Sequence, residues 1–419
     1  MPPVPAKVGL SARYMTRFRC LASECEATCC GGGAVPVEES THRRLTVLAN
    51  DDPVASELLT RGIELTPNGP DFAQLRFLAS GDCSMLDGAG LCRIQSRFGH
   101  DALFDVCATY PRYVNEVDGE IEQFGTLSCP EVARLVLLSE DGFEPEPLEL
   151  DAAPRKFRNR FGTEQPYFKP FKLVRAALVR LLAEPGYALP EKLLVMLWMA
   201  DKLRSVLHAG CSQVPIADLK AVLGALAEPE VLRGLTASFR KLELDDSLPI
   251  AVIARALRPA PRLRHGAQTA RFDAILHEMW TTYGRAEPGA DATDAELTAV
   301  QARYAALRAG VPDAVRERVD VCLLRYAANH LLTTPYMLSN SLFGYAYDLV
   351  VRLASLRFLL QTRLSGFVGS PAELDRQIVE VTYAFVRSLE HSGAFGELLR
   401  LLDEQGLSGL PHALCFLAI

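Results

Sequence analysis

The chain has 419 residues, 49% of them hydrophobic and 23% charged, and a formal net charge of -7 at pH 7. This length exceeds what one compact core usually organises, so we expect at least two domains. The acidic balance argues against a nucleic-acid-binding protein, because such proteins are usually basic. The N-terminal MPPVPAKVGLSARYMTRFRC lacks the apolar stretch of a secretory signal, and the longest apolar run, KLLVMLWMA, is too short to span a bilayer. We therefore expect a cytoplasmic protein without membrane segments.

Short elements and many turn residues characterise the N-terminal third. FAQLRFLA (72–79) predicts a strand. HDALFDVCATYP (100–111) predicts a short helix that ends near Tyr110, because the residue before a proline avoids the helical conformation. VNEVDGEIEQFGTLS predicts a hairpin that turns at Asp118-Gly119.

A change of pattern near residue 139 suggests a domain boundary. SCPEVARLVLLS predicts a helix closed at its N-terminus by a capping box of Ser128 and Glu131, and it completes a first domain of residues 1–138. Residues 139–170 are rich in proline and charge and predict a linker. From 171 to 419 the apolar residues recur at helical spacing, which predicts an all-α second domain.

Long amphipathic segments fill this second domain. The clearest predicted helices cover residues 190–210, 293–310, 312–332, 342–366 and 370–393. The last of them begins with a capping box of Ser370 and Glu373. Residues 258–272 and 285–294 predict loops between helices. The expected fold is therefore mainly α, with a small irregular cysteine-rich N-terminal domain that contains a few short strands.

The chain's 11 cysteines are unevenly distributed. Only Cys211, Cys322 and Cys415 lie in the long remainder, and we expect them to be core residues. In a reducing compartment, clustered thiols more often bind metal or do redox chemistry than form disulfides. The predicted metal ligands are the eight N-terminal cysteines, Cys20, Cys25, Cys29, Cys30, Cys83, Cys92, Cys107 and Cys129.

The cysteine spacing does not identify the metal. Zinc fingers pair their ligands as C-x2-C, and ferredoxins use runs such as C-x2-C-x2-C, neither of which occurs here. Side chains of adjacent residues diverge, so we expect Cys29 and Cys30 to bind different irons of a cluster, or to serve two sites, rather than to share one ion. An iron–sulfur centre, a closed structural zinc site and a set of buried thiols without metal all stay open.

Four ordered, cysteine-bearing blocks resemble the flagellin lysine-N-methylase family. They are FRCLASECEATCC, DCSMLDGAGLCRIQ, CATYPR at 107–112 and SCPEVARL at 128–135, and together they cover about the first third of the chain. The family pattern has all eight of these cysteines. It often has proline where Ser84 follows Cys83, and it favours arginine where Ala108 follows Cys107, but neither difference removes a thiol.

The resemblance implies transfer of methyl groups from S-adenosylmethionine to lysine ε-amines of flagellin. It also implies an iron–sulfur cluster, of the 4Fe-4S type, on the N-terminal cysteines, with zinc as the alternative metal. The residues themselves show no cofactor pocket. GGGAVPVEE (31–39) follows cysteines rather than a strand, so it predicts backbone that wraps a metal centre rather than a nucleotide-binding loop.

Lysine methylation needs a neutral amine, although an exposed lysine has a pKa near 10.4. A base and aromatic walls would suit this chemistry. Tyr110 and Arg112 follow Cys107 closely and are the candidate catalytic residues, either supporting the metal centre or binding a cofactor carboxylate. The alternative is that Tyr110 packs in the core and Arg112 pairs with an acid. Glu131 is better explained as a helix cap than as a base.

Two further groups of polar residues fit ordinary structural roles. Tyr345, Tyr347 and Asp348 lie on one predicted helix and are expected to be interface residues. A basic run lies in the predicted linker and consists of Arg155, Lys156, Arg158 and Arg160. We expect these residues to be solvated side chains of the linker rather than a contact site for an acidic protein.

The favoured function is thus a protein lysine N-methyltransferase that uses S-adenosylmethionine, carries an iron–sulfur cluster and acts on a flagellin-like protein. Two alternatives remain. One is an iron–sulfur redox enzyme acting on a peptide or amino acid, and the other is a non-catalytic zinc-binding adaptor whose thiolates only hold the fold.

Overall fold

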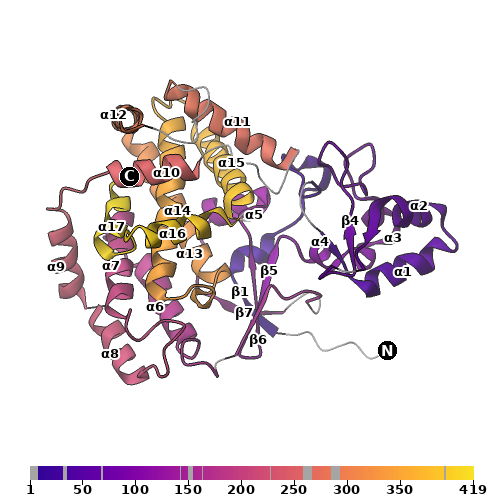
Figure 1. Cartoon of the computed structure of the whole chain (residues 1–419), viewed down its shortest axis with the longest axis horizontal. Helices are drawn as coiled ribbons and strands as arrows, with labels where there is room; N and C mark the ends of the chain where they lie inside the picture. The colour runs from indigo at the N-terminus through magenta and orange to yellow at the C-terminus, as the bar shows by residue number, and fades with distance from the viewer. Residues whose placement is uncertain are drawn as a thin grey trace.

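The computed structural model describes residues 8–31, 35–67, 69–141, 143–149, 154–162, 164–226, 228–257, 267–284, 293–390 and 393–419. A helical body and a small lobe lie on either side of a β-sheet (Figure 1). The prediction of a mainly helical chain with a few short N-terminal strands is confirmed. The division into domains at residues 138 and 171 stays a prediction.

The small lobe has its own hydrophobic core, which includes Leu58. Helix α2 begins at Pro53 because Asp52 caps it, with Oδ1 accepting the backbone N–H groups of Val54 and Ala55. The elements of the lobe are α1 (Glu39–Ala49), α2 (Pro53–Gly62), α3 (Arg93–Phe98), α4 (Asp105–Thr109) and an antiparallel sheet in the order β2 (Pro36–Val37), β4 (Ala73–Leu75), β3 (Ile63–Leu65).

The central sheet is assembled from distant parts of the chain. Its order is β7 (Glu146–Glu149), β1 (Val8–Ser11), β6 (Glu120–Gly125), β5 (Arg112–Val117), β8 (Asn159–Phe161). The β5–β6 hairpin turns at Asp118 and Gly119, as predicted, with φ of 54° and 78°. The segment 139–170, predicted as a linker, supplies β7 and β8, which pair with β1 and β5. This segment is therefore partly ordered by backbone hydrogen bonds to the sheet.

The helical body follows the sheet in sequence. Its helices are α6 (Phe171–Ala183), α7 (Leu189–Lys202), α8 (Ile216–Leu226), α9 (Pro229–Phe239), α10 (Ser247–Ala256), α11 (Ala267–Thr282), α12 (Asp294–Ala309), α13 (Asp313–Thr333), α14 (Leu342–Arg363), α15 (Pro371–Leu389), α16 (Ala394–Glu404) and α17 (Leu410–Cys415). Each long helix predicted from periodicity is present, although α7 ends at Lys202, earlier than the predicted residue 210. The predicted capping box at Ser370 is confirmed in one half: the Ser370 Oγ accepts the backbone N–H of Glu373, whereas the Glu373 carboxylate accepts from Arg376 and Gln377.

Helices α13 and α6 contact the sheet directly, α13 against β6 and α6 through ion pairs with β6. Helix α5 (Pro130–Leu138) packs against α13 and α15, and α13 also contacts β6. A buried hydrogen-bonded set joins the two parts: the Tyr14 hydroxyl donates to Asn329 Oδ1 at 2.5 Å, and Asn329 Nδ2 donates to the Gly125 carbonyl at 3.1 Å. The Gly125 N–H donates to the Tyr14 hydroxyl at 3.0 Å, so the end of β6 is fixed against α13.

Local predictions were corrected at three places. Helix α11 begins at Ala267, inside the predicted loop of residues 258–272. The strand predicted at 72–79 is only the short β4, because its backbone bends toward the cysteine loop after Leu75. The predicted capping box of Ser128 and Glu131 is wrong. Helix α5 has Cys129 as its N-cap without a side-chain cap, and Glu131 forms an ion pair with Arg134 instead.

Some predictions fall outside the described residues. These are residues 32–34 of the glycine run, 142, 150–153 and 163 of the predicted linker, 258–266 and 285–292 of the predicted loops, and 391–392 of the last predicted helix. In the parts of the chain that are described, no helix has the length and apolarity needed to cross a membrane.

A buried ion pair between the sheet and α6 gives a stability test. Glu122 and Arg175 are 0% and 7% exposed and form two hydrogen bonds of 2.6 Å. Replacing Arg175→Met strands a buried carboxylate, so we expect the free energy of unfolding to fall by about 3–5 kcal/mol. Denaturant unfolding of the purified chain measures this loss.

The same two elements supply a matched control. Lys172 and Glu120 form an exposed ion pair at 2.6 Å, and Lys172→Met should cost less than about 1 kcal/mol. Removing both buried charges, in Arg175→Met with Glu122→Met, should restore much of the lost stability. A double variant as unstable as Arg175→Met would show that the stranded carboxylate is not the cause of the loss.

Candidate functional site

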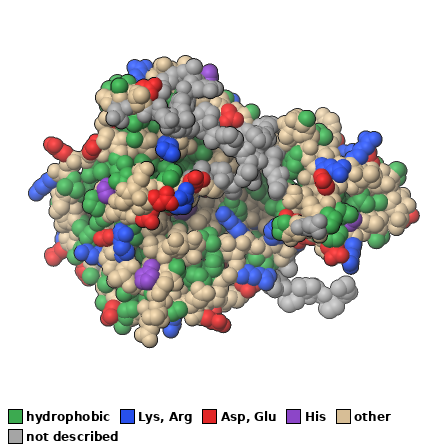
Figure 2. Space-filling model, in the orientation of Figure 1, with side chains coloured by type: hydrophobic (Ala, Val, Ile, Leu, Met, Phe, Trp, Pro, Cys, Tyr) green, Lys and Arg blue, Asp and Glu red, His purple; other side chains and the backbone are tan. Residues whose placement is uncertain are grey.

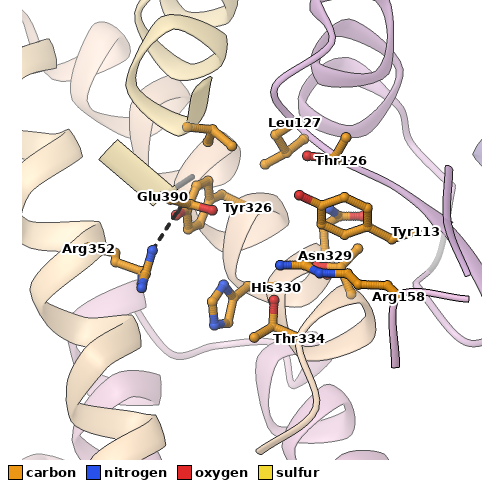
Figure 3. Close-up of a pocket in the computed structure, with 12 residues that line it drawn as sticks. Tyr113, Thr126, Leu127, Arg158, Tyr326, Asn329, His330, Thr334, Arg352 and Glu390 are labelled. Atoms are coloured by element: carbon orange, nitrogen blue, oxygen red, sulfur yellow. Dashed lines mark hydrogen bonds and ion pairs between the residues drawn. The ribbon is translucent and has the colours of Figure 1, made fainter. Parts of the chain in front are cut away.

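The described residues form a polar pocket where the sheet meets α13, α14 and α15. Its empty volume is about 500 Å³, part of which is open solvent. Acidic and basic side chains lie mixed over the face in Figure 2, which is hollowed between the helical body and the small lobe. The pocket is lined by Tyr113, Thr126, Leu127, Arg158, Tyr326, Asn329, His330, Thr333, Thr334, Arg352, Val386 and Glu390. Figure 3 shows Tyr326, Glu390 and Arg352 on one side, and Tyr113 and Arg158 on the other.

A charged network forms the α14–α15 wall of the pocket. The Tyr326 hydroxyl donates to Glu390 Oε1, and Arg352 Nη1 lies 3.8 Å from the same oxygen. Arg352 Nε also donates to Asp348 Oδ2 at 2.6 Å. Burial raises the pKa of Glu390 above its usual 4.5, and the nearby charge of Arg352 only partly opposes this. Glu390 is thus a carboxylate with enhanced basicity that faces a cavity.

His330 lies at the base of the pocket, one helical turn after Tyr326. It is 5% exposed, and its Nε2 has no hydrogen-bond partner among the described residues. Burial, and then the charges of Arg352 and Arg158, hold the pKa of His330 well below its usual 6.5. The imidazole is therefore neutral at physiological pH. Its ring lies nearly parallel to that of Tyr326, with ring centroids 6.4 Å apart.

The opposite wall combines an aromatic ring and a cation. The guanidinium carbon of Arg158 lies 3.7 Å from the centroid of the Tyr113 ring. The Arg158 backbone N–H donates to the Val114 carbonyl at 2.7 Å, which fixes this residue against β5. The wall therefore offers both guanidinium donors and an aromatic face to a ligand.

Most of the N-terminal cysteines lie around one of their number, Cys29. Burial raises the pKa of five of these thiols, to about 11 for Cys83 and Cys129; the five are Cys25, Cys83, Cys92, Cys107 and Cys129. A negative charge on Cys29 would raise the pKa of each of the five further, which indicates that all of them lie near Cys29. The Cys29 and Cys30 Sγ atoms are 4.0 Å apart, closer than the divergence expected of neighbouring side chains. Residues far apart in sequence thus bring their thiols together.

Backbone contacts support this cysteine cluster, the name used below for Cys25, Cys29, Cys30, Cys83, Cys92, Cys107 and Cys129. The Cys83 N–H donates to the Cys30 carbonyl at 3.1 Å, and Gly31 forms a β-bridge with Asp82. Cys20 is exposed, and nothing in the structure joins it to the cluster. Of the three later cysteines, Cys322 is buried as predicted, whereas Cys211 and Cys415 are only partly buried.

The donor chemistry of the cluster fits a thiolate-ligated metal centre. One tetrahedral zinc ion with Zn–S bonds of about 2.3 Å needs ligand sulfurs roughly 3.8 Å apart. Among the described residues, which include all eight N-terminal cysteines, no three His, Cys, Asp or Glu side chains surround one ion position. An iron–sulfur cluster binds its thiolates on different irons and so spaces them more widely. The identity of the metal, and its binding to these thiols, stay predictions.

Arg387 connects the cysteine cluster to the pocket. Its side chain, in a residue only 4% exposed, donates to the carbonyls of Ser128, Thr28 and Ala27 at 2.9 to 3.4 Å. These carbonyls adjoin Cys129 and Cys29. On the same helix, Val386 and the following Glu390 line the pocket. One end of α15 therefore contacts both features.

The two candidate catalytic residues lie beside the cluster and do not line the pocket. The Tyr110 hydroxyl lies 3.2 Å from Ser128 Oγ, and burial raises its pKa. The guanidinium carbon of Arg112 lies 5.4 Å from the centroid of the Phe18 ring. Their catalytic role stays a prediction. In the basic run, Arg155 pairs with Asp105, whereas Arg158 reaches the pocket.

Sequence reasoning did not find Tyr326, His330, Arg352 or Glu390. The sequence did contain a pattern that could have indicated them. Tyr326 and His330 are four residues apart and so share a helix face, and the same holds for Asp348 and Arg352. The sequence instead predicts Asp348 as an interface residue, and it does pair along its own helix with Arg352. The approach of Glu390 and Arg158 could not be inferred, because it depends on how α15 and β8 pack.

The comparisons with known proteins agree on one family. A family model described as the FliB lysine N-methylase C-terminal domain matches residues 175–416, more than half of the chain. A lysine-N-methylase of Salmonella typhimurium is 29% identical over 129 residues, 30% of this chain and 32% of that protein. A flagellar biosynthetic protein FliU of Salmonella muenchen is 28% identical over 129 residues, 30% of this chain and 76% of that protein. The match thus spans about a third of the Salmonella typhimurium relative, and no solved structure matches the chain.

Removing the Arg387 side chain should loosen the cysteine cluster. Arg387→Met leaves buried carbonyls of the two cysteine segments without donors, at a cost of about 1–3 kcal/mol each. We expect the alkylation rate of the buried Cys129 in the metal-free protein, followed by mass spectrometry, to rise roughly tenfold. The control is Arg376→Met on the same helix, which removes only an exposed ion pair with Glu373. Equal rates in the two variants would contradict the proposed role of Arg387.

Proposed function

The chain belongs to the FliB lysine N-methylase family, and we propose that it is a protein lysine N-methyltransferase whose methyl transfer takes place in the pocket between the sheet and α13–α15. The observation that carries this proposal is the Tyr326–Glu390 pair. It provides a partly buried carboxylate with a raised pKa at an accessible cavity, within the segment that the family model matches. A lysine methyltransferase needs such a group, because only the neutral amine is nucleophilic.

The chain's own residues supply the proton chemistry. Glu390 attracts the lysine ammonium into the pocket and accepts one of its protons, which leaves a neutral amine. The Tyr326 hydroxyl, bonded to Glu390, orients the carboxylate and is kept protonated by burial, which raises its pKa. Burial raises the pKa of Glu390, and the nearby charge of Arg352 opposes part of this rise.

S-adenosylmethionine, the proposed donor, supplies an electrophilic methyl group: the N–C bond forms as the S–C bond breaks, and the bonding electron pair stays on sulfur. The ring of Tyr326 offers an aromatic face to the positive sulfonium, whereas the Tyr113 ring already contacts the Arg158 guanidinium. Arg158 offers guanidinium N–H donors for the carboxylate of the donor's methionine part. Glu390 first releases to solvent the proton that it accepted, and the methylammonium product then loses a proton to the regenerated carboxylate or directly to solvent.

An iron–sulfur cluster on the cysteine cluster is the second part of the proposal. It would hold together the four chain segments that carry these thiols, and Arg387 would transmit their position to the pocket. Polar methyl transfer requires no electron, so the proposed cluster has a structural or positioning role. Zinc remains the alternative metal.

The proposed substrate is a flagellin-like protein. Relatives are named lysine-N-methylase and flagellar biosynthetic protein, and these names motivate the choice. An open pocket suits a lysine on the surface of a folded protein or on a mobile tail, since the side chain alone has to enter.

Replacing the proposed base tests the function directly. Purified full-length protein is incubated with S-adenosylmethionine carrying a deuterated methyl group and with purified flagellin, and labelled lysine is counted by mass spectrometry. We expect labelling by the wild type and a loss of about 10²-fold or more in Glu390→Gln, which cannot accept the proton. Glu404→Gln, which alters an exposed ion pair with Arg400, is the control and should keep full activity.

The pH dependence of the methylation rate provides a second test of the Glu390→Gln variant. Burial raises the pKa of Glu390, so its proton-accepting form is lost as the pH falls through a value above 4.5. The wild-type rate should therefore fall on the acid side, and Glu390→Gln should lose this limb. No labelling by the wild type would refute the proposed function, and full activity of Glu390→Gln would refute the role of the carboxylate.

Metal analysis tests the cluster separately. Protein purified without oxygen should contain iron and equimolar acid-labile sulfide, with broad absorption near about 400 nm. Cys29→Ser should lose most of the iron because Cys29 is central to the cysteine cluster, whereas Cys415→Ser should retain it. Zinc alone, or no metal, would exclude an iron–sulfur cluster.

A further inference from the structure

The base of the pocket contains a polar atom without a partner. His330 Nε2 is buried and has no hydrogen-bond partner in the described parts of the chain, although the residue lines an accessible cavity. A buried, unpaired ring nitrogen is costly unless a ligand pairs with it. The proton-transfer chemistry described above uses Glu390 and leaves this nitrogen without a role.

The groups around the ring keep it neutral. Arg352 from α14 and Arg158 beside the sheet are the cations that face it. Tyr326 from α13 and Tyr345 from α14 cover its faces, with ring centroids 6.4 and 5.5 Å from the imidazole. Ammonium ions would be repelled by a charged imidazole, whereas a neutral one offers a lone pair to an N–H donor.

We propose that His330 Nε2 is a hydrogen-bond acceptor for the reacting lysine amine and, with the Glu390–Tyr326 pair, fixes the direction of its lone pair. This inference rests on the proposed function and adds a second amine-binding group to it. A neutral primary amine has two N–H bonds and one lone pair. When the lone pair points at the methyl donor, both N–H bonds need acceptors, and the pocket has one on α15 and one on α13.

The geometry also controls how many methyl groups the amine accepts. After one transfer and loss of a proton, the amine has one N–H bond, one lone pair and a methyl group. With His330 in place, that methyl group has to lie against a polar nitrogen when the lone pair again faces the donor. An apolar side chain at this position removes the acceptor and provides an apolar contact for the methyl group. The second transfer is therefore disfavoured by His330 and favoured by its apolar replacement.

The test compares His330→Leu, which removes the acceptor, with His330→Asn, which retains one. Initial rates are measured with flagellin and S-adenosylmethionine, and mass spectrometry resolves mono-, di- and trimethyl-lysine. For His330→Leu we expect kcat to fall roughly tenfold or more, because a misdirected lone pair reacts slowly. The remaining product should shift toward more highly methylated lysine. His330→Asn should recover part of the rate and the wild-type distribution.

Two controls separate amine positioning by His330 from a structural role and from donor binding. His277→Leu, at an exposed position on α11, should match the wild type, and thermal unfolding of each variant reports whether the fold is kept. A purely structural role would lower the amount of active enzyme without changing the product distribution, and that result would overturn the inference. An increase confined to the KM for S-adenosylmethionine would also overturn it, by assigning Nε2 to the donor.

The outcomes distinguish this inference from the function on which it rests. If the wild-type protein labels no lysine, the proposed function fails. If the wild type labels lysine and His330→Leu keeps both its kcat and its product distribution, methyl transfer stands and the role of His330 is refuted.

Discussion

The buried guanidinium of Arg387 is the interaction on which the rest of this structure depends. It donates to three backbone carbonyls in two segments that are about one hundred residues apart in sequence, and each of those carbonyls lies next to a cysteine or within two residues of one. A lysine could not replace it, because only the planar guanidinium reaches several acceptors at once. The position of α15 is thereby tied to the cysteine cluster, and α15 in turn sets where Glu390 lies.

The pocket is polar because several helices end or cross there with charged side chains turned inward. Such a network is costly unless its members satisfy one another. Arg352 meets this requirement by contacting both Asp348 and Glu390, and the Tyr326 hydroxyl adds a hydrogen bond. Two atoms near this network have no partner among the described residues: Nε2 of the pocket-lining His330, and Oδ1 of Asp348, which pairs with Arg352 through its other oxygen. Apolar residues would fill a core more cheaply, and these retained polar atoms motivate the proposed binding site.

Sequence periodicity predicted the helical body well because each long helix buries one face, and burial at helical spacing is a local property. The Asp118-Gly119 hairpin was equally accessible, since the turn requires positive φ at both residues. The capping box at Ser128 failed because tertiary contacts took its hydroxyl, which bonds Tyr110 and Thr126 instead of the helix. The pocket was missed for the same reason. Its residues come from β5, β8, α13, α14 and α15, and no local pattern states that these elements meet.

The cysteine motif and the pocket residues carry different kinds of information. Four short blocks hold the thiols and are legible in sequence, because a metal centre demands cysteine itself at each position. The pocket requires a hydrogen-bond acceptor, an aromatic ring or a cation at a given position, but several residue types on different helices or strands can provide each of these groups. Arg387 and residues 126–129 connect the cysteine cluster to the pocket. Thr126 and Leu127 line the pocket, and Cys129 belongs to the cysteine cluster. The cysteine cluster and the pocket are therefore separated by only one turn of α15 or four residues of chain, and this short path is how the proposed metal centre would affect the position of the pocket residues without a redox role.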